Sequence, residues 1–273
     1  MRIGRIIWAV AAAALVTASS CSPSSKTETQ PDKQDQDKQQ SQGQAAQAEK
    51  ETNTEIAGTV ILDANNGCGL VTNAKTGKGI EGVTVTDGTT CVLTDKNGVY
   101  QFSLDSYARN VYISVPSAYK IPLDAKTQVP KFYRDLPVKR DGKVRNDFAL
   151  EPLDAKETKF TMIMIGDPQC KTTAQIGRYK NETISDIKGT LEKGQSKGKY
   201  PSPYAMTLGD IIFDTPELWD DMRASMSGVK VGGEWLPFFQ CIGNHDHNGT
   251  KTSSDYAAVS DYIERFGPTD YSF

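Results

Sequence analysis

The sequence has few histidines, few apolar residues and no excess of basic charge. Only two of its 273 residues are histidines, His245 and His247, which limits the metal and proton-transfer chemistry that histidine can supply. Hydrophobic residues make up 37%, below the ~45–50% of an ordinary globular chain. The net charge is −3, so no nucleic acid is expected as a binding partner. This composition excludes a collagen, a long coiled coil and a multi-span membrane protein.

The N-terminus has the pattern of an export signal. Arg2 and Arg5 flank the start of an apolar run that is too short to span a bilayer. Small residues then lead into Cys21, and this arrangement resembles the bacterial lipobox, whose cysteine is lipidated. We therefore predict that residues 1–21 are a lipoprotein signal and that a lipid on Cys21 anchors the protein to a membrane of the bacterial cell envelope. An ordinary secretory signal with an accidental cysteine is the alternative.

The segment after Cys21 cannot build a core. Residues 22–54 contain no Val, Ile, Leu, Met, Phe, Tyr or Trp, and eight of them are Gln. Such a segment buries too little apolar surface to offset the entropy lost on ordering. We predict that residues 22–55 are a disordered tether that holds a folded part away from the membrane.

Short runs separated by turn residues fill positions 56–152. Tyr100, Phe102 and Leu104 share one face at period two, directly after a tight-turn pattern at 95–98. No stretch here shows a sustained period of 3.6 residues. The pattern predicts an all-β sandwich domain.

Three motifs in this segment carry a family resemblance: Gly-Val-Thr-Val-Thr-Asp-Gly at 82–88, Thr-Asp-Lys-Asn-Gly-Val-Tyr at 94–100, and Asn-Asp-Phe at 146–148. They resemble the N-terminal domain of some calcineurin-like phosphoesterases, which is similar to transthyretin-like and carboxypeptidase-regulatory-like modules. The acids of this segment lie in turns, where Asp bonds its own backbone. The resemblance therefore implies a spacer or docking module without a catalytic group.

The pattern changes between residues 158 and 273. Apolar runs alternate with stretches of helical periodicity, which predicts a parallel sheet with crossover helices. The first run is nearly continuous, which predicts a strand buried on both faces. In chain order we expect a strand at 160–165, a helix at 172–192, a strand at 204–208, a helix at 217–226 and a strand at 236–242.

Each of these three strands is followed by a residue able to bind a metal: Asp167, Asp210 and Asn244. The carboxyl ends of parallel strands share one edge of the sheet, where ligands bind in open α/β folds. A single Asp after a strand is often a helix N-cap instead. Three such residues on consecutive strand ends predict a metal site.

The motifs Gly209-Asp210 and Gly243-Asn244-His245-Asp246 resemble the calcineurin-like metallophosphoesterase superfamily. That family has a D-x-H motif, then G-D, then G-N-H-D or G-N-H-E, followed by two later histidine motifs. The first motif departs here, because Gln169 stands where the family usually has a histidine. The resemblance implies an α/β domain of the α-β-β-α type and a metal-dependent hydrolase of phosphoester substrates.

The resemblance also implies two metal ions, Mn, Fe or Zn. Asp167 would bind the first metal together with Gln169, Asp210 would bridge both metals, and Asn244 would bind the second. Together the metals would activate a water that attacks phosphorus.

His245 would stabilise the phosphate and protonate the leaving oxygen, with Asp246 orienting its ring. We interpret Asp214 as a supporting or capping residue and His247 as a solvated loop residue.

The later histidine motifs have no counterpart here, because both histidines lie in or beside the third motif. The last residues, 267–273, resemble the opening of a strand near the middle of the family's catalytic domain. We therefore expect this chain to be the N-terminal part of a longer enzyme. We expect residues 1–273 alone to bind metal poorly and to turn over little or no substrate, and phosphodiesterase activity of that purified chain would contradict this expectation.

The remaining cysteines fit an exported protein. Cys68 and Cys91 could form a disulfide outside the cytoplasm, and the sequence leaves this open. Cys170 and Cys241 are interpreted as buried thiols, with a metal role for Cys170 as the alternative.

Two other functions stay open. The chain could be a non-catalytic surface lipoprotein that binds or docks through its β-sandwich. An unrelated α/β hydrolase with Asp167 as the nucleophile would leave the Gly-Asn-His-Asp motif unexplained. The sequence does not identify the phosphoester.

Overall fold

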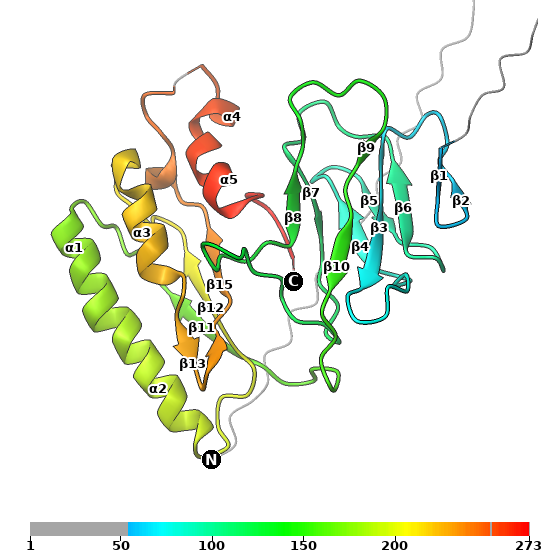
Figure 1. Ribbon diagram of the computed structural model, residues 1–273. Coiled ribbons are helices and arrows are strands. Elements are labelled where there is room, and N and C mark those ends of the chain that lie inside the picture. The colour runs from blue at the N-terminus through cyan, green and yellow to red at the C-terminus, as the bar shows by residue number, and fades with distance from the viewer. Residues whose placement is uncertain (1–53, 252, 273) are drawn as a thin grey trace, which may run out of the picture. The chain divides into compact units, whose positions relative to one another are not determined.

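Short strands make up the first half of the described chain (Figure 1). The computed structural model describes residues 54–251 and 253–272. The predicted signal, Cys21 and all of the tether before residue 54 lie outside this part. Within it, no helix is long and apolar enough to cross a membrane.

Ten strands and no helix occupy residues 54–150, all of which are described. They are β1 (Glu55–Ile56), β2 (Thr59–Val60), β3 (Gly67–Asn73), β4 (Thr84–Thr86), β5 (Cys91–Leu93), β6 (Val99–Phe102), β7 (Asn110–Ile113), β8 (Tyr133–Asp135), β9 (Val144–Arg145) and β10 (Phe148–Leu150). The prediction that this region is built from short strands is confirmed.

The larger strands of this region form two sheets that share one buried core. One sheet has the order β10-β3-β6 with β9 also paired to β3, and the other has the order β5-β4-β7-β8. The predicted period-two residues Tyr100, Phe102 and Leu104 are all buried in this core. Val85 and Ile113 of the second sheet belong to the same buried cluster.

The turn pattern before β6 forms as predicted. Gly98 has a φ of 80°, and an added Cβ would overlap the Val71 carbonyl oxygen, so only glycine fits. The Asp95 carboxylate accepts hydrogen bonds from the backbone N–H groups of Asn97 (2.8 Å) and Val99 (2.9 Å). An acid in this region therefore closes its own turn.

The described cysteines are free thiols. Cys68 is buried and Cys91 is exposed, so the disulfide that the sequence left open does not form in this structure. Burial raises the pKa of the Cys68 thiol. Cys170 is buried and Cys241 half-buried, and burial raises the pKa of both.

Strands and helices alternate in the second half of the chain. The strands are β11 (Thr161–Ile165), β12 (Pro203–Leu208), β13 (Lys230–Val231), β14 (Glu234–Trp235) and β15 (Phe238–Cys241). The α-helices are α1 (Thr173–Arg178), α2 (Ser185–Gln195), α3 (Trp219–Met226), α4 (Asp255–Ala258) and α5 (Ser260–Phe266). A π-helical stretch, Tyr179–Ile184, joins α1 to α2, and 3-10 turns span Pro216–Leu218 and Asn244–Asp246.

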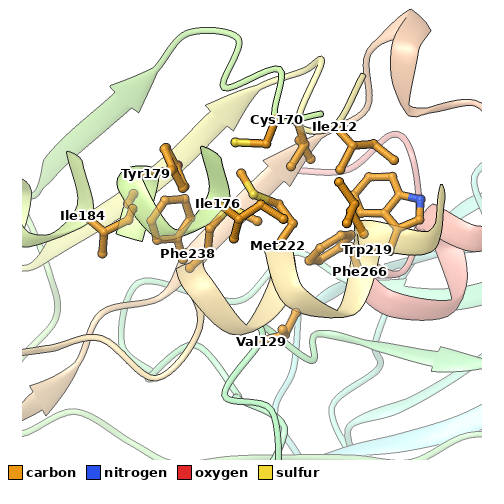
Figure 2. Close-up of a cluster of buried hydrophobic side chains, with 14 of the residues drawn as sticks. Val129, Cys170, Ile176, Tyr179, Ile184, Ile212, Trp219, Met222, Phe238 and Phe266 are labelled. Atoms are coloured by element: carbon orange, nitrogen blue, oxygen red, sulfur yellow. The ribbon is translucent and has the colours of Figure 1, made fainter. Parts of the chain in front are cut away.

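The predicted parallel sheet is confirmed. Strands β11, β12 and β15 pair in parallel in that order, and helices α1, α2 and α3 lie along one face (Figure 1). The predicted first helix begins at Thr172, whose hydroxyl oxygen accepts the backbone N–H of Gln175 at 3.2 Å and so caps the helix. Figure 2 shows the core between sheet and helices, where Trp219 and Met222 of α3 are fully buried.

The expectation for β11 was wrong. Its apolar run predicted burial on both faces, but Met164 is 61% exposed and no residue of the strand is fully buried. Ile163 and Ile165 pack against the core shared with the helices, whereas Met164 between them points to the other face and is exposed. β11 is also an edge strand that pairs only with β12 among the described strands, and apolar content alone predicts neither feature.

Candidate functional site

The loops that follow β11, β12 and β15 are held together by backbone hydrogen bonds. The Gln169 N–H donates to the Asp210 carbonyl at 2.9 Å, joining the first loop to the second. The Asp214 N–H donates to the His245 carbonyl at 3.1 Å, joining the second loop to the third. The convergence that the parallel sheet predicts at this edge therefore occurs.

Glycine allows the second and third loops to approach closely. An added Cβ on Gly243 would overlap the backbone nitrogen and carboxylate of Asp210. Three non-glycine residues beside this contact, Gln169, Asp210 and Asp214, have φ values of 45°, 45° and 55°. Left-handed backbone is uncommon in such residues and concentrates at functional sites.

Asp210 is the centre of the site. Its Oδ2 accepts a hydrogen bond from Gln169 Nε2 at 3.2 Å, and its Oδ1 accepts the backbone N–H of His245 at 3.1 Å. One carboxylate thus contacts both neighbouring loops, which is the position that a shared ligand needs.

The His245 ring is held by two neighbours from the second loop. Its Nδ1 lies 3.1 Å from Asp214 Oδ1, and its ring stacks on Phe213 with centroids 3.8 Å apart and an angle of 18°. The ammonium of Lys171 lies 3.5 Å from the Phe213 ring centroid. Because an ionised carboxylate only accepts, Nδ1 carries the proton of this bond.

The expected role of Asp246 needs correction. Its side chain does not reach the His245 ring. It is 1% exposed and accepts the backbone N–H groups of Ile211 (2.8 Å), Ile212 (3.0 Å) and Gly243 (2.8 Å). Burial raises the pKa of Asp246 to about 6, against the lowering effect of these three donors. Asp246 therefore fastens the second loop to the third, and Asp214 is the carboxylate that orients His245.

Sequence reasoning named Asp214 but gave it only a supporting or capping part. Asp214 lies in the same loop after β12 as Asp210, and this position was the only hint in the sequence that it takes part in the site. Which carboxylate meets the ring depends on how the loops pack, because Asp246 is adjacent to His245 in the chain and yet points away from it.

Two of the predicted metal ligands, Asp167 and Asn244, form no hydrogen bond with Asp210 or with each other in the part of the chain that the structure describes. The Asp167 and Asn244 side chains are exposed on the first and third loops, and neither makes a hydrogen bond or ion pair within residues 54–251 and 253–272. Cys170 is buried with its Sγ 3.8 Å from the Pro168 carbonyl.

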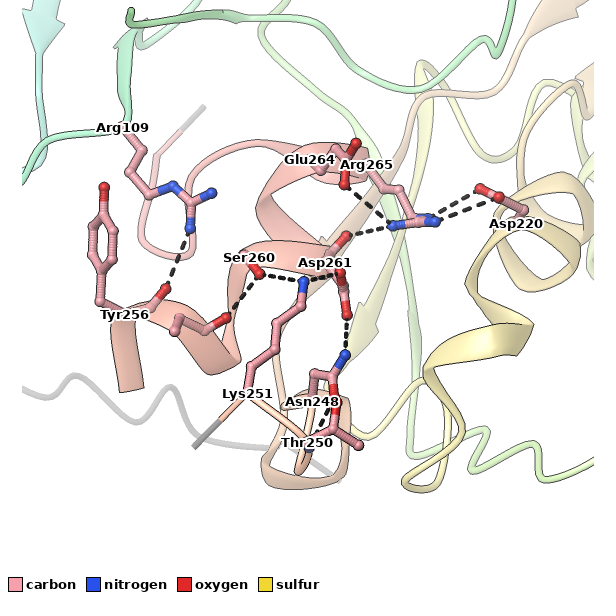
Figure 3. Close-up of polar contacts among 11 residues, drawn as sticks. Arg109, Asp220, Asn248, Thr250, Lys251, Tyr256, Ser260, Asp261, Glu264 and Arg265 are labelled. Carbon is pink, nitrogen blue, oxygen red and sulfur yellow. Dashed lines mark hydrogen bonds and ion pairs between the residues drawn. The ribbon is translucent and has the colours of Figure 1, made fainter. Parts of the chain in front are cut away.

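The loop after Asn244–Asp246 is tied to helix α5 (Figure 3). Asn248 Nδ2 donates to Asp261 Oδ2 at 2.5 Å, and Lys251 Nζ lies 2.6 Å from Asp261 Oδ1. The Asn248 N–H also donates to the Ala258 carbonyl at 2.8 Å. These bonds tie the third loop to helices α4 and α5.

The donor chemistry around Asp210 fits a cation only in part. Its carboxylate is a ligand that hard cations take, but Gln169 turns its amide nitrogen toward that carboxylate, and the Asn244 side chain lies exposed on the third loop. The described part of the chain brings no group of three or more His, Cys, Asp and Glu side chains together around a metal position. The described residues therefore offer the Asp210 carboxylate as one ligand and do not form a complete one-metal or two-metal ligand set.

Comparison with known proteins adds one finding. Residues 65–153 match the family model described as the N terminal of calcineurin-like phosphoesterase. The match covers strands β3 to β10 and ends before β11, so it supports the calcineurin-like phosphoesterase family without touching the site residues. No curated protein matches the chain.

Proposed function

We propose that this protein is a phosphoester hydrolase whose activity depends on divalent or trivalent metal ions. The observation that carries the proposal is the Asp210 carboxylate, which contacts both neighbouring strand-end loops beside an oriented histidine. The match of residues 65–153 to the N terminal of calcineurin-like phosphoesterase points to the same family.

Asp210 and Gln169 are the residues that would hold a cation, with Asp167 and Asn244 on the flanking loops as further oxygen ligands. When bound, Mn, Fe or Zn ions polarise a phosphoryl oxygen and lower the pKa of a bound water. A second ion needs ligands beyond those that the described residues gather, and the proposal includes it on the family resemblance alone.

His245 is the residue that would move a proton. Asp214 accepts the proton-bearing Nδ1, and Phe213 covers one ring face, which fixes the ring plane. Nε2 is then the atom that can exchange a proton with the leaving oxygen of the ester. General acid–base groups held in this way typically contribute about 10²–10⁴-fold to a rate.

The test is hydrolysis of bis-p-nitrophenyl phosphate by the protein isolated from the cells that produce it, after loading with Mn, Fe or Zn. We expect His245→Gln to lower kcat at least about 100-fold and Asp210→Asn to remove metal-dependent turnover. Asp63→Asn, an exposed acid of the first half, is the matched control and should retain full activity. Hydrolysis that survives both site variants, or that ignores metal chelation, would overturn the proposal.

The proposal extends to location, on the support of the sequence alone. A lipid on Cys21 would hold the hydrolase at a membrane of the bacterial cell envelope. The Cys21→Ser substitution should move the protein from the membrane fraction to the soluble fraction of fractionated cells. Membrane retention of that variant would contradict the anchor.

A further inference from the structure

A cleft lies at the opposite end of the parallel sheet from the candidate site. It has a volume of about 780 Å³ and includes the first residues of β12 and the residues just before β15, with Pro203 and Pro237 in its wall. Asp210 and His245 follow the other ends of these strands. The six residues of β12 separate the two places by roughly 20 Å at the usual rise of a strand. The cleft is therefore independent of the candidate catalytic site, and its volume is typical of a ligand site.

The two halves of the chain both contribute walls to this cleft. Ile121 and Leu123 line it from the first half, and Leu236 lines it from the second. Tyr204 of β12 and Trp235 of β14 add aromatic surface. These side chains suit a ligand with an aliphatic or flat apolar part.

The charged lining of the cleft is mostly acidic. Four carboxylates, Glu151, Asp154, Glu157 and Glu234, face a single ammonium, that of Lys120. Lys120 Nζ pairs with Glu151 Oε1 at 3.0 Å. The pKa of Lys120 is raised, first by this hydrogen bond and also by the charges of Glu151, Glu234 and Asp154.

Two of these carboxylates are not used within the structure. Glu157 Oε2 accepts the hydroxyl of Tyr204 at 2.7 Å, and Glu151 is occupied by Lys120. Asp154 and Glu234 make no side-chain hydrogen bond or ion pair with any other described residue. The cleft thus keeps two acceptors for a positive group.

Trp235 adds a partly exposed indole to the cleft. Its side chain is 39% exposed, and the ammonium of Lys230 lies 4.2 Å from its ring centroid on one face. A positive group of a ligand would therefore meet the part of the indole that Lys230 leaves open, beside the carboxylates.

We propose that this cleft binds a basic peptide segment, with a Lys or Arg side chain lying against Trp235 and its charge between Asp154 and Glu234. The apolar wall suits the aliphatic stem of such a side chain, while its head meets the acidic rim. An anionic phosphoester would be repelled here, so this site is distinct in ligand class from the proposed catalytic one. It does not depend on the proposed hydrolase activity.

The experiment titrates the full chain with acetyl-tetralysine amide and follows tryptophan emission and binding heat. The chain has three tryptophans, and the titration is made in a Trp8→Phe background. Trp219 is fully buried, so an emission change at low ionic strength then reports mainly on Trp235, and Trp235→Phe should remove it. We expect saturable binding that weakens with added salt and falls about fivefold in each of Asp154→Asn and Glu234→Gln. Asp63→Asn is the control and should bind like the parent chain.

Three results would overturn the proposal. One is equal binding of acetyl-tetraglutamine amide, which has no charge. Another is unchanged affinity in the double variant Asp154→Asn with Glu234→Gln, provided that its Trp219 emission shows an intact fold. The third is tighter binding of spermine than of the peptide, which would assign the cleft to small polycations.

Discussion

Aspartates in the loops of the two halves of this molecule differ in what they join. In the first half they often close turns: Asp95 accepts the N–H groups of Asn97 and Val99, and Asp124 accepts those of Lys126 and Thr127. In the second half Asp210, Asp214 and Asp246 join loops of one sheet edge across 31 to 41 residues of chain. Turn closure is thus prominent in the first half, whereas three acids converge at the edge of the parallel sheet in the second.

The topology explains this difference. In the first half most strand pairs are antiparallel and the chain returns through short turns, so an acid in a turn has backbone donors close to it. Some acids there also accept from distant residues, as Asp147 does from the Leu70 N–H 77 residues away. In the second half the parallel strands send three loops to one edge, where the nearest donors belong to other loops. The candidate site is a consequence of that topology.

The largest effect should come from forcing the loops apart. Gly243→Ala would place a Cβ against the Asp210 backbone, and we expect it to lower the free energy of unfolding by more than about 3 kcal/mol. Gly166→Ala, in the first loop where an added Cβ meets nothing within 4 Å, is the matched control. Urea denaturation followed by Trp219 emission measures both, and similar midpoints would show that the close approach is unimportant.

The second-largest effect should come from removing the buried Asp246 carboxylate, which joins the second loop to the third. Asp246→Ala leaves three backbone N–H groups unpaired, and we expect a loss of about 2–3 kcal/mol in unfolding free energy. Asp95→Ala removes two local N–H contacts and one from the Thr59 hydroxyl at a more exposed turn, and should cost about 1–2 kcal/mol. Thermal unfolding of the two variants compares a loop-joining acid with a turn-closing one, and a larger loss in Asp95→Ala would reverse the comparison.

A smaller effect is expected at the histidine. Phe213→Ala removes the ring that stacks on His245 and the surface that Lys171 covers, which should cost about 1 kcal/mol. Phe160→Ala removes an exposed ring that makes one edge-to-face contact with Tyr204, so it should change stability less. The difference between the two denaturation midpoints is the measurement, and a larger effect at Phe160 would contradict the stacking account.

The smallest effect should be at the surface pair of Asp220 and Arg265 (Figure 3). Hydrogen bonding from Arg265 lowers the pKa of Asp220 below its usual 3.8. The pair therefore stabilises the fold above about pH 4, and this contribution disappears as the pH falls through the lowered value. Because Asp220 is 65% exposed, we expect less than about 1 kcal/mol. Asp220→Asn should be slightly less stable than the parent at pH 7, and the gap should narrow as the pH falls below about 4. A gap that widens in acid would contradict the sign.

The sequence predicted what depends on local pattern. Alternation at Tyr100, Phe102 and Leu104 indicated a core-facing strand, and the strand–helix alternation after residue 158 indicated the parallel sheet. It did not predict the exposure of Met164, because the face of a strand that the helices cover depends on tertiary packing. Nor did it separate Asp214 from Asp246, because the partner of each carboxylate is set by loops distant in the chain.

We propose that Asp210 binds a cation at the edge of the parallel sheet, whereas the turn-closing acids of the first half do not. The most direct test is a Mn²⁺ titration of the full chain by electron paramagnetic resonance, with Asp210→Asn and Asp95→Asn compared under the same conditions. The account predicts saturable Mn²⁺ binding, weak in the absence of further ligands, that is retained in Asp95→Asn and lost in Asp210→Asn. Equal binding by the two variants would contradict it.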